Sequence, residues 1–565
     1  MLRALKVAAI AACVVLLFVW LLLPPAAAVT SLAPASTLRG AFHIHSNRSD
    51  GSGSVDEIAA AAARAGLQFI IVTDHGDGTR APDAAAYRSG VLTIDGVELN
   101  TTAGHYAAFG LPQSPYPIAG APADVIEDVH RLGGFGVAAH PGSPRPSLSW
   151  RDWDAPIDGL EWINSDSEWR DEPRLPMAGA LLTYFFRAPE SMAALLDRAD
   201  DVFAHWDQLA ARRKVVGLAG ADAHARLGFR QRTDPDAAAI HVQFPGYESS
   251  FRTFSNDVAI DAPMTRQAAA DARVLVRSIR AGRVYSVIDA LASPGRLLFT
   301  ATSGKHSAQM GESLPIDGDV QLHAAVAAPA GTRIVLLRNG QRVHEVTDGP
   351  LDMNGGTAAA EYRIEAYTAK GPGAPPVPWL VSNPIYAGVA LQPENAAVIS
   401  EPLSRVAARV AEAAAEKGAT DTSAVRTVSV FDDRDPAGAP GVEWSFALAP
   451  GTAAGQFAAM AVPVSEGLSS FDRVRFRVSA AAPMRAWVQL RAPVGKTERW
   501  GRTFYVDATP RIVDLPLNTF APIGVTSSPQ APLARVDSLL FVVDTLNTLP
   551  GSKGTMTISA VGFVK

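Results

Sequence analysis

Short apolar runs alternate with alanine-rich amphipathic segments from about residue 38 to residue 290. This alternation is typical of buried strands joined by helices, and a β/α barrel is the simplest closed arrangement of such elements. A helix is predicted over 56–65, because small residues cover most of its faces and Gly66 follows as a C-terminal stop. The clearest strands are predicted at 40–45, 69–73, 91–94, 135–139, 159–163 and 215–219.

The pattern becomes β-rich after residue 293. Strand-like runs at 297–302, 320–325 and 332–337, with the turn Asn339-Gly340, predict a small β-sandwich over 293–392. A helical pattern at 401–417 predicts a linker over 393–424. A second β-unit is predicted over 425–565, with strands near 474–479, 486–491 and 538–543.

Aromatic residues are grouped in two of the predicted segments. Tyr184, Phe185, Phe186 and Trp206 belong to a helical insertion over 173–209, where they fit either core packing or a substrate lid. The C-terminal unit loosely resembles a jelly-roll carbohydrate-binding module, which implies a glycan partner. Core packing is the alternative for its aromatic residues, which are Trp444, Phe446, Trp487, Trp500 and Tyr505.

The N-terminus carries Arg3 and Lys6 before an apolar run over 7–23. This charge asymmetry keeps the start in the cytoplasm and predicts export of the remainder. Residues 1–29 are predicted to be a signal anchor or a cleaved signal peptide, and we favour an anchor in the inner membrane. The protein is therefore expected to be periplasmic or otherwise extracytoplasmic.

Composition narrows the classes of function. The chain has 565 residues, 48% hydrophobic and 19% charged, which predicts several packed domains. Its formal net charge is -6 and it has no long basic block, so stable nucleic-acid binding is not expected. Cys13 is the only cysteine, which excludes an intrachain disulfide.

Short histidine and carboxylate motifs follow the predicted strands. Because residues two apart on a strand face the same side, the two imidazoles of a His-x-His pair can reach one metal ion. A barrel also gathers the C-terminal ends of its strands around one opening. Six imidazoles and three carboxylates there predict a metal site of nine ligands: His43, His45, Asp50, His75, Glu98, His105, His140, Asp222 and His224.

In this order, the motifs resemble those of the polymerase and histidinol phosphatase (PHP) family. The resemblance covers about 40–290 and implies a distorted seven-stranded (β/α)7 barrel with two or three divalent ions of Mn, Fe or Zn. It assigns His43, His45, Glu98 and Asp222 to one ion. It assigns Glu98, His105 and His140 to a second ion, and Asp50, His75 and His224 to the third.

The resemblance and the charges together predict an extracytoplasmic phosphoesterase. Three divalent ions against three carboxylates leave about three positive charges, which favour an anionic, phosphorylated small-molecule or envelope substrate. Metal coordination lowers the pKa of water to about 7, so a metal-bound hydroxide is the expected nucleophile for phosphomono- or phosphodiester hydrolysis. A carboxylester or carbamate hydrolase with the same metals is the first alternative. A non-catalytic, metal-stabilised envelope binding protein is the second.

Three further residues are candidates for catalysis. Asp74 lies beside the ligand His75 and could orient an imidazole or a water, or take part directly. Arg145 and Arg226 follow two of the motifs and could hold a phosphate through paired N–H donors. A solvated surface arginine is the alternative for each.

Overall fold

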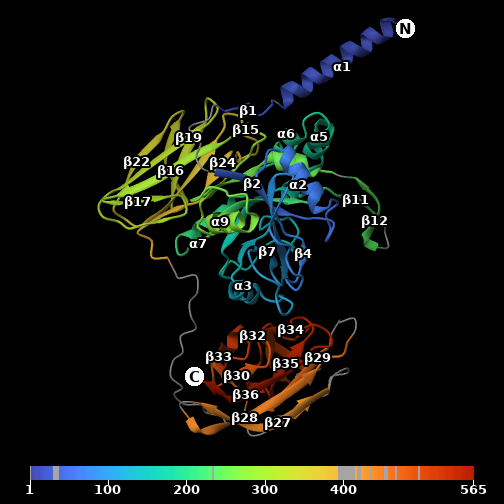
Figure 1. Ribbon diagram of the computed structural model, residues 1–565, viewed down its shortest axis with the longest axis vertical. Helices are drawn as coiled ribbons and strands as arrows, with labels where there is room; N and C mark the ends of the chain where they lie inside the picture. Colours follow the sequence, from blue (N-terminus) through green and yellow to red (C-terminus); the bar gives the residue numbers. More distant parts are fainter. Residues whose placement is uncertain are drawn as a thin grey trace. The chain divides into compact units, whose positions relative to one another are not determined.

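The computed structural model describes two compact units (Figure 1). The first comprises 1–77, 81–112 and 121–395, and the second comprises 78–80, 113–120 and 396–565. The residues described are 2–23, 25–29, 37–231, 234–242, 244–391, 414–416, 422–432, 435–450, 456–464, 467–493 and 497–565.

Seven strands close a ring in the first unit. The order β2-β3-β6-β7-β8-β9-β10 returns to β2 through a parallel pairing of β10 with β2. The ring strands are β2 (Thr37–Ile44), β3 (Phe69–Val72), β6 (Val91–Thr101), β7 (Gly104–Phe109), β8 (Phe135–Ala138), β9 (Gly159–Asn164) and β10 (Val216–Ala223). The predicted seven-stranded barrel is confirmed.

The ring is distorted because one of its strands runs against the others. Strand β7 is antiparallel to both β6 and β8, whereas the remaining neighbours in the ring are parallel. It forms a hairpin with β6, in which Thr101 lies opposite Gly104. No separate strand was predicted at this place, although His105 was predicted to be a ligand. Antiparallel β7 brings that ligand back to the strand end that carries Glu98.

Apolar side chains fill the barrel and the layer outside it. Phe42, Phe69, Ile94 and Phe109 belong to one buried cluster, and α2 packs Ile58 with neighbouring alanines into another. The helix begins with a capping box, in which Ser54 and Glu57 bond reciprocally to each other's backbone. The two clusters hold the strand ends in fixed positions.

Nine α-helices are present in the described residues, besides the short 3-10 helices η1 (Leu517–Thr519) and η2 (Leu533–Arg535). They are α1 (Leu2–Leu22), α2 (Val55–Arg64), α3 (Pro122–Arg131), α4 (Ser165–Asp171), α5 (Arg174–Tyr184), α6 (Ala188–Ala193), α7 (Asp200–Ala210), α8 (Tyr247–Thr253) and α9 (Ala268–Arg280). The segment 173–209 is helical, as predicted. Within the described part of the chain, no helix has the length and apolar character that crossing a membrane requires, so the predicted membrane segment is not supported.

A sheet continues from the barrel into a β-sandwich. Strand β13 pairs with both β2 and β14, and β14 pairs with β24 of the sandwich. The small strands beside the barrel are β1 (Ala27–Ala28), β4 (His75–Gly76), β5 (Ala86–Arg88), β11 (Leu227–Gln231), β12 (Asp234–Val242), β13 (Ser255–Ala259), β14 (Val284–Val287) and β15 (Ala292–Ser293). The predicted turn Asn339-Gly340 connects β20 and β21, and both of its residues have positive φ.

Two sheets make up this sandwich. One has the order β17-β16-β19-β22, and the other contains β21, β20, β23, β24, β25 and β18. The strands are β16 (Arg296–Ser303), β17 (His306–Gln309), β18 (Ser313–Leu314), β19 (Val320–Ala327), β20 (Arg333–Arg338), β21 (Gln341–Thr347), β22 (Leu351–Gly356), β23 (Ala360–Tyr367), β24 (Leu380–Ser382) and β25 (Ile385–Ala387).

The C-terminal unit is a second sandwich, drawn in orange and red in Figure 1. One sheet has β26 (Ala414–Glu416), β29 (Phe457–Pro463), β31 (Met484–Ala492), β32 (Glu498–Val506), β34 (Ala521–Ile523) and β35 (Ser538–Asp544). The other has β27 (Thr422–Asp432), β28 (Asp435–Ala447), β30 (Arg473–Ala480), β33 (Arg511–Pro516) and β36 (Lys553–Val564). Trp444, Phe446 and Trp500 are buried in its core, as the packing alternative predicted.

Most of the predicted linker helix over 401–417 lies outside the described residues. Its last described part is Ala414–Glu416, which forms strand β26 and pairs with β29. A helix was therefore the wrong prediction for these three residues. Pairing with β29 is a tertiary contact that a local helical pattern does not reveal.

Candidate metal centre

All nine predicted ligands meet at one end of the barrel. They come from strands of the ring, from β4 beside it and from the loop after β2, and several lie at or just after a C-terminal strand end, where barrel enzymes collect their functional groups. His43 lies within β2, His75 in β4, Glu98 in β6 and His105 in β7. His45, His140 and His224 follow β2, β8 and β10, and Asp222 lies within β10.

Glu98 is the centre of the cluster. Its Oε2 lies 3.3 Å from His43 Nε2, 3.2 Å from His45 Nε2 and 3.2 Å from His75 Nδ1. Its Oε1 lies 2.8 Å from His105 Nδ1 and 2.9 Å from His140 Nε2. The Glu98 side chain is only 1% exposed. Its two oxygens therefore face two different groups of imidazoles, as a carboxylate that bridges two ions does.

Asp222 completes the inner group. Its Oδ1 lies 3.5 Å from His43 Nε2 and 3.3 Å from His45 Nε2. His43 Nε2 and His45 Nε2 are both buried and have no hydrogen-bond partner. Two ligands about 2.1 Å from a shared ion lie roughly 3.0–3.4 Å apart, so these spacings fit a divalent ion better than a hydrogen bond. The nitrogen and oxygen donors suit Zn, Mn or Fe.

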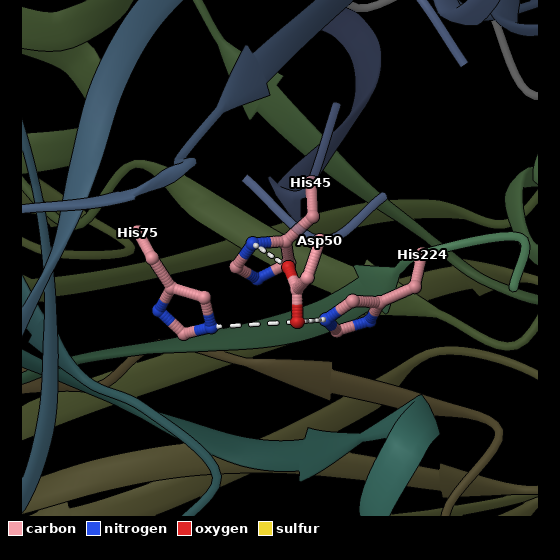
Figure 2. Close-up of side chains that lie close together, drawn as sticks. All are labelled: His45, Asp50, His75 and His224. Carbon is pink, nitrogen blue, oxygen red and sulfur yellow. Dashed lines mark ion pairs between the residues drawn. The ribbon is translucent and has the colours of Figure 1, made fainter. Parts of the chain in front are cut away.

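Asp50 makes a second, more open group, shown in Figure 2. The Asp50 carboxylate points between three imidazoles, 3.4 Å from His45 Nδ1, 3.7 Å from His75 Nε2 and 3.2 Å from His224 Nε2. The Asp50 side chain is 46% exposed, whereas His43 and His45 are 0% exposed. The Asp50 group, which the family resemblance assigns to the third ion, is therefore the group of ligands closest to solvent.

The backbone is strained at three of the ligands. His43, His140 and Asp222 have φ values of 65°, 34° and 42°, in a region that residues with a Cβ rarely adopt. Each such residue costs of order 1–3 kcal/mol and persists only where the surrounding structure enforces it. Because the strain coincides with the cluster, we infer that the barrel fixes these side chains in advance.

Glu161 is a buried partner that the motifs did not indicate. It lies on β9, and its Oε1 is 2.6 Å from His43 Nδ1. Its Oε2 accepts the backbone N–H of His140 at 2.6 Å and the side-chain amide of Asn164 at 2.7 Å. A Cβ on neighbouring Gly220 would come within 2.0 Å of the carboxylate, so this position requires glycine. Glu161 thus orients two ligands at once, as outer carboxylates of metal sites do.

Asp74 supports the loop that carries Asp50. It accepts the backbone N–H and the hydroxyl of Ser46, both at 2.7 Å, and the hydroxyl of Ser49 at 2.7 Å. Both carboxylate oxygens are thus occupied by the loop, and the side chain is buried. Its role is therefore to position the loop, and the predicted catalytic role is not supported.

Tyr247 holds the same loop from the other side. Its hydroxyl donates to the carbonyl of His45 at 2.8 Å and accepts the backbone N–H groups of Ser52 and Gly53 at 3.1 Å each. Within the loop, a Cβ on Gly51 would approach the carbonyl oxygen of His45 to 2.1 Å. This contact explains the glycine of the Ser-Asp-Gly motif, whereas no sequence signal indicated Tyr247.

The carboxylates set the protonation of the cluster. Burial alone would lower the pKa of His43 and His45, but neighbouring carboxylates raise it well above its usual value for His43 and to about 9 for His45. Burial would raise the pKa of Glu98 and Asp222, but the surrounding imidazoles hold both well below their usual range. The carboxylates are therefore ionised, and a metal ion must compete with protons for the imidazoles.

A cavity of about 730 Å³ opens over the Asp50 group. Such a volume lies within the range of small-molecule sites. Arg226 lines the cavity, and its Nη1 donates to the carbonyl of Asp50 at 3.3 Å. Arg170 of α4 lines it as well, although no motif indicated this residue. Arg145 is exposed and does not line the cavity, so its predicted role at the phosphate is not supported.

Comparison with known proteins leaves the family open. No family model matches the chain, and no curated protein matches it. The solved structures to which it is similar include a two-domain protein from Bacteroides vulgatus that contains a predicted PHP-like metal-dependent phosphoesterase. The two are 14% identical, the match covers 60% of this chain and 92% of that one, and the TM-score is 0.26.

Two other solved structures are similar to separate parts of the chain. One is a proposed metal-dependent phosphoesterase from Bifidobacterium adolescentis, 16% identical over 40% of this chain and 95% of that one, with a TM-score of 0.20. The other is a family 11 carbohydrate-binding module from Clostridium thermocellum, 15% identical over 27% of this chain and 86% of that one, with a TM-score of 0.21. At such values the likeness says nothing about activity, which must be judged from the site.

Proposed function

We propose that the protein is a metal-dependent phosphoesterase that hydrolyses phosphomono- or phosphodiesters at the barrel mouth. The observation that carries this proposal is the nine-residue ligand cluster, shared around Glu98, beneath a cavity with two guanidinium groups. Two or three divalent ions fit the cluster. When bound, such ions lower the pKa of coordinated water and stabilise negative charge on a phosphoryl oxygen.

The charges of the site support an anionic substrate. Three ions and the three ligating carboxylates leave three positive charges, and Glu161 reduces this excess to two. Arg226 and Arg170 add positive charge at the wall of the cavity, although Arg170 also pairs with Asp166. Two oxygens of a phosphate can each accept a hydrogen bond from one guanidinium, which fixes the orientation of the phosphate as well as its place.

The protein's own residues position the substrate and the metal ligands. Arg226 holds one side of the substrate, and Glu161 holds the imidazole of His43 and the backbone N–H of His140. Asp74 and Tyr247 hold the loop that carries Asp50. Catalysis by this arrangement depends on orientation and on charges placed before the substrate arrives. No nucleophilic side chain is required.

The test compares two substrate classes in one metal-loaded preparation. We expect para-nitrophenyl phosphate or bis-para-nitrophenyl phosphate to be hydrolysed faster than para-nitrophenyl acetate or an aryl carbamate. Inorganic phosphate should inhibit by competition. Faster hydrolysis of the neutral esters would favour the carboxylester or carbamate alternative. A fully metal-loaded protein inactive on every ester would favour the non-catalytic binding protein.

The cellular place of this activity is a further part of the proposal. An exported enzyme at the inner membrane, with the C-terminal unit binding an envelope glycan, would act on phosphorylated envelope components. The support is the charge pattern of the N-terminus and the separate sandwich after residue 396. Fractionation of cells and binding of the intact protein to cell-wall polysaccharide would test it.

A further inference from the structure

An apolar slot adjoins the cavity at the metal centre. It lies between α4, α5 and α6, where Met177, Leu181 and Leu196 face it. Ser165, Trp169, Phe244 and Pro245 line both the slot and the cavity, so one wall belongs to both. A ligand group over the Asp50 group of metal ligands can therefore continue into the slot without leaving the protein.

The slot is neutral as well as apolar. Glu168 is the only acid among its lining residues, and burial among Asp197, Asp171 and Glu172 raises its pKa to about 8. The carboxyl group is therefore mostly protonated at neutral pH. A charged group would gain nothing in this slot, whereas an alkyl chain would be removed from water there.

Helix α5 carries apolar side chains on both of its faces. Met177, Leu181 and Tyr184 face the slot, whereas Leu175 and Leu182 point outward and are 84% and 70% exposed. Phe185, directly after the helix, is 85% exposed. A helix that is apolar all round is normally buried, and exposed apolar patches usually mark binding surfaces. In the part of the chain that the structure describes, these side chains remain in solvent.

The exposed outer face of α5 bears on how a ligand enters the slot. In this structure the slot holds about 30 Å³, which is room for about two water molecules. A longer chain enters only if α5 moves outward. The end of α5 is held by hydrogen bonds from Tyr184 to Ser249 and from Ser191 to Thr183. No side-chain cap fixes the start of the helix, so the start is the part that can move outward.

We propose that the substrate is an amphiphile, with a phosphate ester head in the cavity at the metal centre and an alkyl chain in the slot beneath α5. This inference rests on the proposed function and names its substrate class. Amphiphiles gather in micelles or bilayers, which also supply an apolar phase for the outer face of α5. The head and the chain are recognised by different surfaces that share one wall.

The experiment uses the full-length, metal-loaded protein and two phosphodiesters with the same leaving group. Methyl para-nitrophenyl phosphate and octyl para-nitrophenyl phosphate are compared below the concentration at which the octyl compound aggregates. We expect the octyl compound to have a kcat/KM at least about tenfold higher, because several methylenes become buried. Equal values with the methyl compound hydrolysed would overturn the amphiphile and leave the phosphoesterase intact.

Two aspartate variants of α5 separate the slot from the outer face. Met177→Asp places a charge in the slot and should abolish the preference for the octyl compound, with hydrolysis of the methyl compound within about threefold of wild type. Leu175→Asp is the matched control on the outer face and should keep the preference. Full metal content in both variants shows that they are folded. Loss of the preference in the control alone would contradict the slot.

A binding measurement covers the case in which neither ester is hydrolysed, which would reject the proposed function. Octyl phosphate and ethyl phosphate are titrated into the same preparation by calorimetry. Tighter binding of octyl phosphate to wild type than to Met177→Asp would support the slot as an alkyl site. Equal binding of the two compounds to wild type would overturn it.

Discussion

The barrel mouth and the interior of the C-terminal sandwich differ in the kind of side chain that they bury. At the barrel mouth, buried imidazoles and carboxylates lie at the spacing of ligands around an ion, and three of them have a strained backbone. In the described part of the C-terminal unit, no group of His, Cys, Asp or Glu lies close enough to hold a metal ion. Its interior is instead a continuous apolar cluster.

This difference indicates which unit is built for catalysis and which is built for stable packing. Unmatched buried nitrogens such as His43 Nε2 are costly without a partner, so a protein keeps them where an ion or substrate compensates for the cost. The core of the sandwich, in which Phe476 makes edge-to-face contacts with Phe504 and Phe541, consists mainly of apolar side chains. The comparison assigns catalysis to the first unit, and the following predictions test that assignment.

The largest effect is expected from the shared carboxylate. Glu98→Ala should lower kcat/KM for an aryl phosphate by more than the roughly 10- to 100-fold that loss of an outer partner causes, because both groups of imidazoles lose their common oxygen donor. Steady-state kinetics with metal in excess would measure this. Activity within a few fold of wild type would show that the cluster is not the catalytic centre.

A smaller effect is expected from the outer carboxylate Glu161. Glu161→Gln removes the charge beside His43 Nδ1 and should weaken metal affinity or activity by about 10- to 100-fold. Competition with a chelator gives the affinity. The matched control for metal affinity is Glu168→Gln, a buried glutamate on α4 whose carboxylate accepts the backbone N–H of Asp197 and not a ligand of the cluster. Equal losses in both variants would indicate a general effect of the substitution.

Removal of the C-terminal sandwich should affect activity least. A protein that lacks 425–565 is expected to hydrolyse a small soluble phosphodiester within a few fold of wild type, because all nine ligands precede residue 225. Metal content and circular dichroism serve as controls for folding. If the truncated protein is folded and metal-loaded yet inactive, the C-terminal unit takes part in the chemistry.

For the variant Glu168→Gln we also expect a change in stability that depends on pH. The pKa of Glu168 in the folded protein is raised to about 8 by burial, whereas its usual value is 4.5. Between these values the unfolded carboxyl group ionises and the folded one does not, so this group lowers stability as the pH rises. Glu168→Gln should therefore raise the unfolding temperature by a few degrees near pH 9, and the gain should shrink toward about pH 5. A gain that does not depend on pH would contradict this account.

The ligands could be predicted from the sequence because each belongs to a short motif next to an apolar strand. The strands of the barrel were predictable for the same reason, with the exception of β7. That strand begins after a two-residue hairpin turn, and its ligand motif is a clearer signal in the sequence than its pattern of apolar residues. The core of the C-terminal sandwich was also partly predictable, since alternating apolar positions such as those of β30 indicate one buried face.

The supporting residues could not be predicted in this way. Glu161 is one acid in the buried strand β9, and only the neighbouring His43 and Gly220 give it a role. Arg170 lies on a short helix whose position over the cavity depends on tertiary packing. Nearness to a ligand in sequence did not place the side chain of Arg145 in the cavity. Asp74 also adjoins a ligand in sequence, and its carboxylate bonds to the loop instead of lining the cavity.

The most direct test of the account is the metal content of purified protein by elemental analysis, for wild type, Glu98→Ala and His75→Ala. The account predicts two to three equivalents of divalent metal in wild type. It predicts that Glu98→Ala loses more than one equivalent, because its two oxygens face two groups of ligands. His75→Ala should lose mainly the ion of the exposed Asp50 group. Wild type with one equivalent or less, or Glu98→Ala with full metal content, would contradict the shared metal centre.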